Sequence, residues 1–192
     1  YEEMAEKVEF MYATSTDTKA GLARTLAQSV CNEGMSLFSA FAMLLNFQRN
    51  GKMLGMCEVV EWSVRDETAH VEGMAKLFRT FCEESREVVT DAFKAEIYEM
   101  YRTAVSLEDA VIDLAFEMGD MQGLTASEVK TYIRFIADRR LTMLGLKPNW
   151  NIEENPLPWI DALISGDSFK NFFEGQVTDY SHGGLVGEWT YA

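Results

Sequence analysis

The feature that most constrains the fold is a series of long segments with helical periodicity, separated by stop signals. Helix-capping side chains at residues 15–17 precede a periodic segment that is predicted to form one helix over residues 18–50. Asn50-Gly51 is a stop signal, and a second helix is predicted over residues 53–84. The first half of the chain is therefore expected to form a long helical hairpin.

The second half continues the pattern. A third helix is predicted over residues 87–118, and a capping box from Thr125 to Glu128 opens a fourth that ends near Leu144. A short first helix is expected over residues 2–14. The chain has 192 residues, 47% of them hydrophobic, and only three prolines, which is enough for one domain with a sizeable core. We predict an all-α fold.

The domain boundary is placed where the pattern changes after Pro148. Residues 1–148 are expected to form the helical bundle portion, and residues 149–192 an irregular C-terminal extension. Since the chain starts with Tyr1 and not with Met, it is expected to be a piece of something longer.

Charge and composition exclude several classes of partner. The formal net charge of −14 leaves no basic stripe for nucleic acid. No signal peptide opens the chain, and no apolar run is long enough to span a membrane. Cys31, Cys57 and Cys82 are odd in number and far apart, which favours free thiols in a reducing compartment. A cytoplasmic location is expected, or the host cytoplasm if the source is viral.

The strongest chemical signal is the pair Glu67 and His70. Residues three apart on a helix share one face, so this pair can hold one metal ion from one side. Glu33 lies 34 residues before Glu67, and the turn at Asn50-Gly51 stands at the midpoint. In an antiparallel hairpin each carboxylate would lie roughly 25 Å from the turn. The three side chains are therefore expected to converge.

Ordinary structural roles compete with this interpretation. Glu33 could be a solvated side chain at the edge of a face, Glu67 could pair with Arg65 or Lys76, and His70 could be a satisfied core histidine. Each alternative is stronger than the ligand role for one residue alone. The matched heights of all three residues favour a metal site. A buried charge is otherwise costly unless it is paired.

Two segments around these residues, CNEGMSLFSAF (residues 31–41) and SVRDETAH (residues 63–70), resemble the second pair of metal-ligand helices in class I ribonucleotide reductase small subunits. Four later segments also match in order. They are IADRRL with LGL (residues 136–146), NPLPW (155–159), NFFE (171–174) and VTDY (177–180). The resemblance covers nearly the whole chain and implies a ferritin-like helical bundle, of which this chain is the second half.

The resemblance also implies residue roles. Glu33, Glu67 and His70 would bind a dinuclear centre of iron, manganese or both. Asp66 would hydrogen-bond a metal-bound histidine and link it to the radical path. Tyr180 matches a tail tyrosine that relays the radical between subunits, and Glu174 matches an acid in the same transfer.

The implied function is that of a ribonucleoside-diphosphate reductase small subunit, whose centre generates and stores the radical that a large subunit uses to make deoxyribonucleotides. The implied partners are that large subunit and a second copy of the small subunit. A different ferritin-like oxidase or oxygenase, or a metal-free structural paralogue, is the alternative.

The family's site also needs an upstream Asp and a second Glu-x-x-His, and neither is present in this sequence. The missing ligands could be supplied by a separate chain or by a segment outside this numbering, or the centre could have been lost. The first two explanations are favoured, because keeping Glu33, Glu67 and His70 together would otherwise be unexplained.

Overall fold

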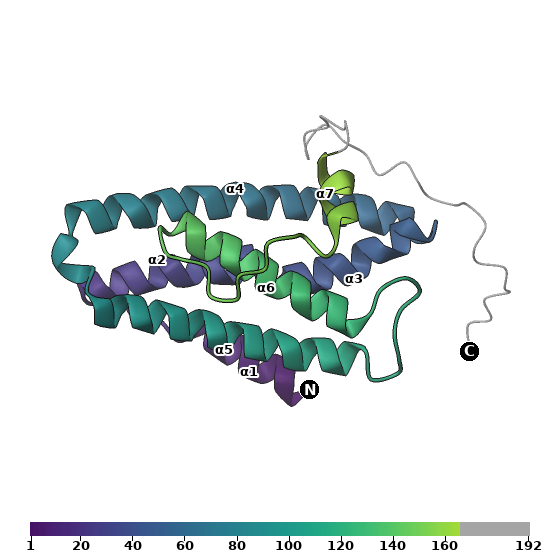
Figure 1. The fold of residues 1–192 in the computed structure, drawn as a ribbon, viewed down its shortest axis with the longest axis horizontal. Helices are drawn as coiled ribbons and strands as arrows, with labels where there is room; N and C mark the ends of the chain where they lie inside the picture. Colours follow the sequence, from purple (N-terminus) through teal and green to yellow (C-terminus); the bar gives the residue numbers. More distant parts are fainter. Residues whose placement is uncertain (166–192) are drawn as a thin grey trace, which may run out of the picture.

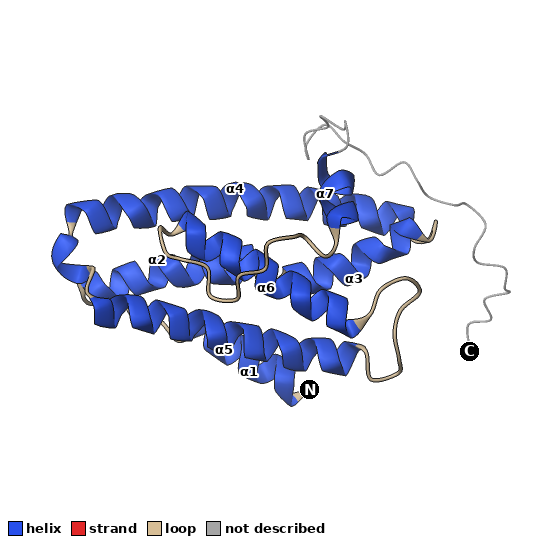
Figure 2. Cartoon of the chain, viewed as in Figure 1, coloured by secondary structure: helices blue, strands red, loops and turns tan. Residues whose placement is uncertain are grey.

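A computed structural model of the chain describes residues 1–165, and every regular element in that range is a helix (Figure 2). In chain order these elements are α1 (Glu2–Tyr12), α2 (Lys19–Gly34), α3 (Phe38–Arg49), α4 (Leu54–Glu84), the 3-10 turn η1 (Arg86–Val88), α5 (Asp91–Ala115), α6 (Ala126–Met143) and α7 (Pro158–Ser165). The predicted all-α class is confirmed.

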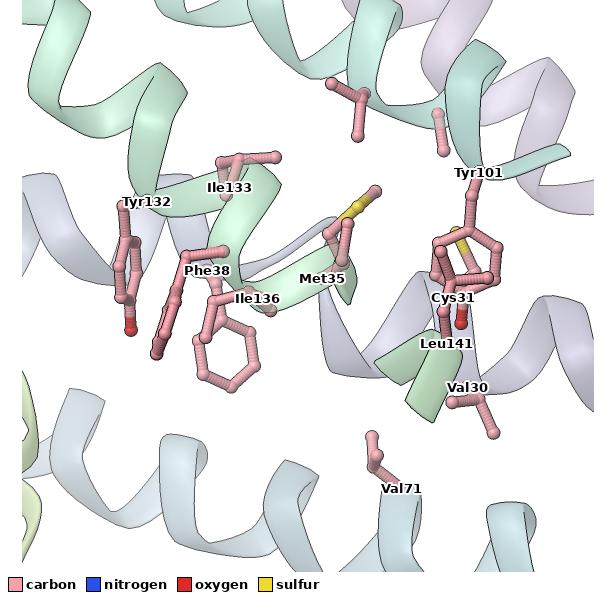
Figure 3. Close-up of a cluster of buried hydrophobic side chains, with 14 of the residues drawn as sticks. Val30, Cys31, Met35, Phe38, Val71, Tyr101, Tyr132, Ile133, Ile136 and Leu141 are labelled. Carbon is pink, nitrogen blue, oxygen red and sulfur yellow. The ribbon is translucent and has the colours of Figure 1, made fainter. Parts of the chain in front are cut away.

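Helices α2 to α6 pack side by side along one long direction, and the short α7 stands across it (Figure 1). α4 forms one side of the molecule, α5 and α1 form the opposite side, and α2, α3 and α6 lie between them (Figure 1). The core fills this middle layer, where α2, α3, α5 and α6 meet (Figure 3). Its centre includes Met35, Tyr101, Ile133 and Leu141, which are almost completely buried. α2 therefore packs against α4 on one side and against α5 and α6 on the other.

Several predicted helix signals are present as expected. Thr125 and Glu128 form a complete capping box at the start of α6. The turn after α3 has Gly51 at a φ of +66°, a conformation that glycine adopts without steric cost. α4 follows as one uninterrupted helix of 31 residues, in agreement with the predicted second helix.

The prediction of one helix over residues 18–50 is wrong, because the chain is interrupted between Gly34 and Phe38. The amide of Met35 donates to the carbonyl of Cys31 as in an α-helix, and the amide of Ser36 donates to the same carbonyl from five residues away. This wider bond ends the α-helical pattern of α2. Gly34 also has a low intrinsic preference for the helix interior. α2 therefore ends one residue after Glu33.

Two other predictions need correction. The third helix begins at Asp91 and not at residue 87, because η1 precedes it and Thr90 caps it by accepting the amide of Phe93. The same helix ends at Ala115. Residues 149–192 are not wholly irregular, since α7 begins at Pro158, where the fixed φ of proline suits a first helical position.

In the part of the chain that the structure describes, no helix is both long and apolar enough to cross a membrane. Cys31, Cys57 and Cys82 are all free thiols, and burial raises the pKa of the Cys31 thiol.

Candidate metal centre

The side chains of Glu33, Glu67 and His70 meet between α2 and α4. One ligand atom from each of them lies within 4.8 Å of the other two. Nδ1 of His70 is 3.5 Å from Oε2 of Glu67 and 4.0 Å from Oε2 of Glu33. Within residues 1–165 this is the one group of three or more acidic, histidine or cysteine side chains with such a spacing. The predicted convergence across the hairpin is therefore present.

The packing of α2 against α4 brings these residues to the same height. Gly34 follows Glu33 and Val71 follows His70, and a β-carbon placed on Gly34 would lie only 3.1 Å from Cγ2 of Val71. The inner face of α4 carries three buried residues, Val64, Val71 and Ala75. Since these positions fix the rotation of the helix, Glu67 and His70 lie along its border.

The three donors suit a hard or borderline divalent metal. Two carboxylates and one imidazole are a ligand set for iron or manganese, whereas softer metals prefer thiolates. Ligand atoms on one ion at about 2 Å lie within about 4 Å of each other. The separations of 3.5 and 4.0 Å from Nδ1 of His70 to the two carboxylates already lie in this range, and all three ligand atoms lie within 4.8 Å of one another. The donor chemistry and the spacing therefore fit a metal ion.

The alternative that His70 is a core histidine is wrong. Its side chain is 54% exposed, compared with 34% for Glu33 and 24% for Glu67. All three donors are thus partly exposed to solvent, whereas other faces of α2 and α4 carry the buried residues of the apolar core. The candidate site is open on one side.

Asp66 lies on the other edge of the His70 ring. Its Oδ1 is 3.8 Å from Nε2 of His70, while Nδ1 of the same ring faces Glu67 and Glu33. The ring thus has one nitrogen toward the candidate ligands and the other toward a carboxylate. That distance is longer than a hydrogen bond, and Asp66 is 74% exposed.

Two contacts at this end of α2 were not predicted from the sequence. Nε of Arg140 in α6 donates to the carbonyl of Gly34 at 2.9 Å, and Nζ of Lys7 in α1 donates to the carbonyl of Ser36 at 2.5 Å. A glycine directly after a candidate ligand inside a helical pattern was the signal for a close approach. It did not reveal which side chains approach.

Two predicted site residues cannot be placed. Glu174 and Tyr180 lie outside the described residues, so their position relative to the candidate centre stays untested.

Comparison with known proteins adds independent information about the chain. The profile of the family described as "Ribonucleotide reductase, small chain" matches residues 1–156. The chain belongs to the ribonucleotide reductase small-chain family. The family resemblance that the ligand helices suggested is thereby confirmed.

Named relatives agree with this assignment. The protein named "Probable ribonucleoside-diphosphate reductase small subunit 048L" of Invertebrate iridescent virus 3 is 44% identical over 160 residues, which cover 83% of this chain and 43% of that protein. The subunit beta of Chlamydia pneumoniae is 38% identical over 152 residues, 79% of this chain and 43% of that protein. The chain therefore spans less than half the length of these two ribonucleotide reductase relatives.

Solved structures confirm the fold. A structure from Bacillus halodurans, assigned to class I ribonucleotide reductases, superposes with a TM-score of 0.79 and 28% identity over 84% of this chain and 59% of that chain. The ribonucleotide reductase R2 subunit from Clostridium botulinum gives a TM-score of 0.70 and 25% identity over 73% and 44% of the two chains. The expected ferritin-like helical bundle is therefore confirmed for this member of the small-chain family.

Proposed function

We propose that this chain supplies Glu33, Glu67 and His70 to a dinuclear iron or manganese centre in the small subunit of a ribonucleotide reductase. The observation that carries the proposal is the convergence of these three donors from α2 and α4 within 4.8 Å. It occurs in a chain whose family is established independently of the site.

The whole protein is proposed to act as a ribonucleoside-diphosphate reductase together with a large subunit. The names of the iridescent-virus and Chlamydia relatives support this substrate class. When bound, the metal centre would supply the radical that the large subunit uses to make deoxyribonucleotides. The cytoplasm, or the host cytoplasm for a viral source, is the proposed location.

The residues around His70 would orient the imidazole. With Nδ1 toward Glu67 and Glu33, the ring would bind the metal through that nitrogen. Nε2 would then keep its proton and point it toward Asp66. A small movement of Asp66 would shorten the 3.8 Å separation to a hydrogen bond and fix the tautomer.

The remaining ligands must come from elsewhere, because the sequence holds no second Glu-x-x-His. A further chain or segment that carries the N-terminal ligands would complete the centre and cover the open side of the site. It would join the large subunit and a second copy of the small subunit as proposed partners.

Glu174 and Tyr180 are proposed to take part in radical transfer to the large subunit. Their support is the sequence match alone. A relative from Invertebrate iridescent virus 6, which is 36% identical, aligns with 99% of this chain, so its alignment extends through both positions.

A titration with Mn²⁺, followed by the loss of the free-ion EPR signal, tests the proposed ligands directly. The wild-type chain should bind Mn²⁺, and Glu67→Gln and His70→Gln should abolish this binding. Glu83→Gln, an exposed position near the end of the same helix, is the matched control and should bind as the wild type does. Equal binding by all four proteins would contradict the assigned ligands, and no binding by any would favour the metal-free paralogue.

A further inference from the structure

The interruption between α2 and α3 is held by two cationic side chains. The last carbonyls of a helix have no partners within the helix and need donors from elsewhere. Arg140 donates to the carbonyl of Gly34, and Lys7 donates to the carbonyl of Ser36. Cations near a helix C-terminus also interact favourably with the helix dipole. Both donors reach the chain within three residues of Glu33.

These two side chains come from different elements and are both largely buried. Arg140 comes from α6 and is 8% exposed, and the Lys7 side chain comes from α1 and is 12% exposed. Lys7 is also 2.5 Å from Oε1 of Glu108, a fully buried carboxylate in α5. The hydroxyl of Ser39 donates to the other oxygen of Glu108 at 2.5 Å. Burying such charges is costly and seldom a net source of stability, so their placement needs another reason.

The Arg140 guanidinium touches the chain on both sides of the interruption. Its Nε binds the carbonyl of Gly34, the last residue of α2, and its central carbon lies 5.3 Å from the ring centroid of Phe38, the first residue of α3. A β-carbon on Gly34 would lie 2.8 Å from Nε of Arg140. The peptide group next to Glu33 is therefore held between α6 on one side and Val71 of α4 on the other.

We propose that Arg140 is a positioning residue for Glu33. It fixes the last residue of α2 so that the Glu33 carboxylate stays level with Glu67 and His70, and Lys7 holds the other half of the same interruption. This inference rests on the proposed metal site, and it adds a residue that does not itself touch the metal.

The test compares Arg140→Met with Arg139→Met in the full chain. Arg139 is adjacent in sequence but exposed, so its replacement removes the same charge without the contact to Gly34. Loss of a group that orients a metal ligand typically weakens metal affinity by about 10–100-fold. We expect Arg140→Met to weaken Mn²⁺ binding by about 10-fold or more. Arg139→Met should bind Mn²⁺ with the affinity of the wild type.

A second measurement does not depend on metal. In the metal-free chain, NMR hydrogen exchange of the Met35 and Ser36 amides should be faster in Arg140→Met than in Arg139→Met, while the amides of α5 should be unchanged. If Arg140→Met does not fold, Arg140→Lys replaces it. Arg140→Lys keeps the charge but moves the donor, so a smaller loss of affinity with the same pattern of exchange is expected.

The outcomes separate this inference from the proposed function. If Arg140→Met or Arg140→Lys lowers the melting temperature but binds Mn²⁺ as tightly as Arg139→Met does, Arg140 has a structural role only and the inference is wrong. If the wild-type chain itself binds no Mn²⁺, the proposed function is wrong, and the positioning role that rests on it is wrong as well.

Discussion

Gly34 of α2 and Val71 of α4 pack so closely that a β-carbon on Gly34 would lie 3.1 Å from Cγ2 of Val71. These residues directly follow Glu33 and His70 in the sequence. The contact that packs the two helices therefore also sets the separation of two proposed metal ligands. A change at this contact should affect both stability and metal binding.

The replacement Gly34→Ala is predicted to destabilise the fold by about 1–3 kcal/mol, because overpacking forces side chains and backbone to shift. Gly73→Ala is the matched control on α4, where an added β-carbon meets nothing within 4 Å. It should leave stability unchanged or raise it by up to about 1 kcal/mol, through the higher helix propensity of alanine. Urea denaturation measures both effects. Equal stability of the two variants would contradict the close contact.

Asp138→Asn is predicted to loosen the segment after α6. Asp138 accepts backbone N–H bonds from Asn149, Trp150 and Ile152 at 2.6, 2.9 and 3.0 Å. The side-chain NH₂ group of asparagine would face at least one of these backbone N–H groups and leave it without an acceptor. We therefore expect the free energy of unfolding to fall by about 1–3 kcal/mol.

Asp113→Asn is the control for Asp138→Asn, because Asp113 is 64% exposed and pairs with Lys130 at the surface. Its cost should stay below about 1 kcal/mol. Thermal denaturation compares the two variants, and a similar loss in both would show that the three backbone bonds contribute little.

Glu108→Gln should change how stability depends on pH. Burial raises the pKa of Glu108 above its ordinary value of 4.5, and the nearby Lys7 only partly opposes this effect. The folded state thus holds the Glu108 proton more tightly than the unfolded state does. The stability that Glu108 contributes is present below a pH of 4.5 and is lost as the pH rises through its raised pKa.

Glutamine mimics the protonated acid, so wild-type protein should lose stability relative to Glu108→Gln as the pH rises from 4.5. Denaturant titrations across this window measure the difference, with the exposed Glu83→Gln as the control. A difference in free energy of unfolding that stays constant with pH would refute the raised pKa.

Tyr180→Phe should abolish nucleotide reduction by the assembled protein with its large subunit and leave Mn²⁺ binding intact. The hydroxyl is the group that a radical relay would need, and phenylalanine keeps the ring without it. Reduction assays and Mn²⁺ titrations on the same preparation separate the two effects. If reduction survives the change, the radical-relay role of Tyr180 is wrong.

Much of the fold and of the candidate site followed from the sequence. The symmetric distance of Glu33 and Glu67 from the turn at Asn50-Gly51 correctly predicted that the two carboxylates would meet, although the first arm of the hairpin is interrupted after Gly34. The capping box at Thr125 was also predicted, since local hydrogen bonds determine it.

The errors arose where distant segments decide the local structure. The interruption after Gly34 is supported by Arg140 and Lys7, which are 106 and 29 residues away from the carbonyls that they bind. Helical periodicity contains no information about such donors. The exposure of His70 likewise depends on which neighbouring elements pack over α4, and the pattern of one helix does not reveal them.

The proposed metal centre is best tested by an anomalous diffraction map from crystals of the chain grown with Mn²⁺. We expect a peak within bonding distance of Nδ1 of His70 and of the carboxylates of Glu33 and Glu67. When the segment with the remaining ligands is also present, a second peak should lie about 3.5–4 Å away. A map with no peak among these three side chains, and with Glu67 and His70 bound to protein groups instead, would contradict the proposed metal centre.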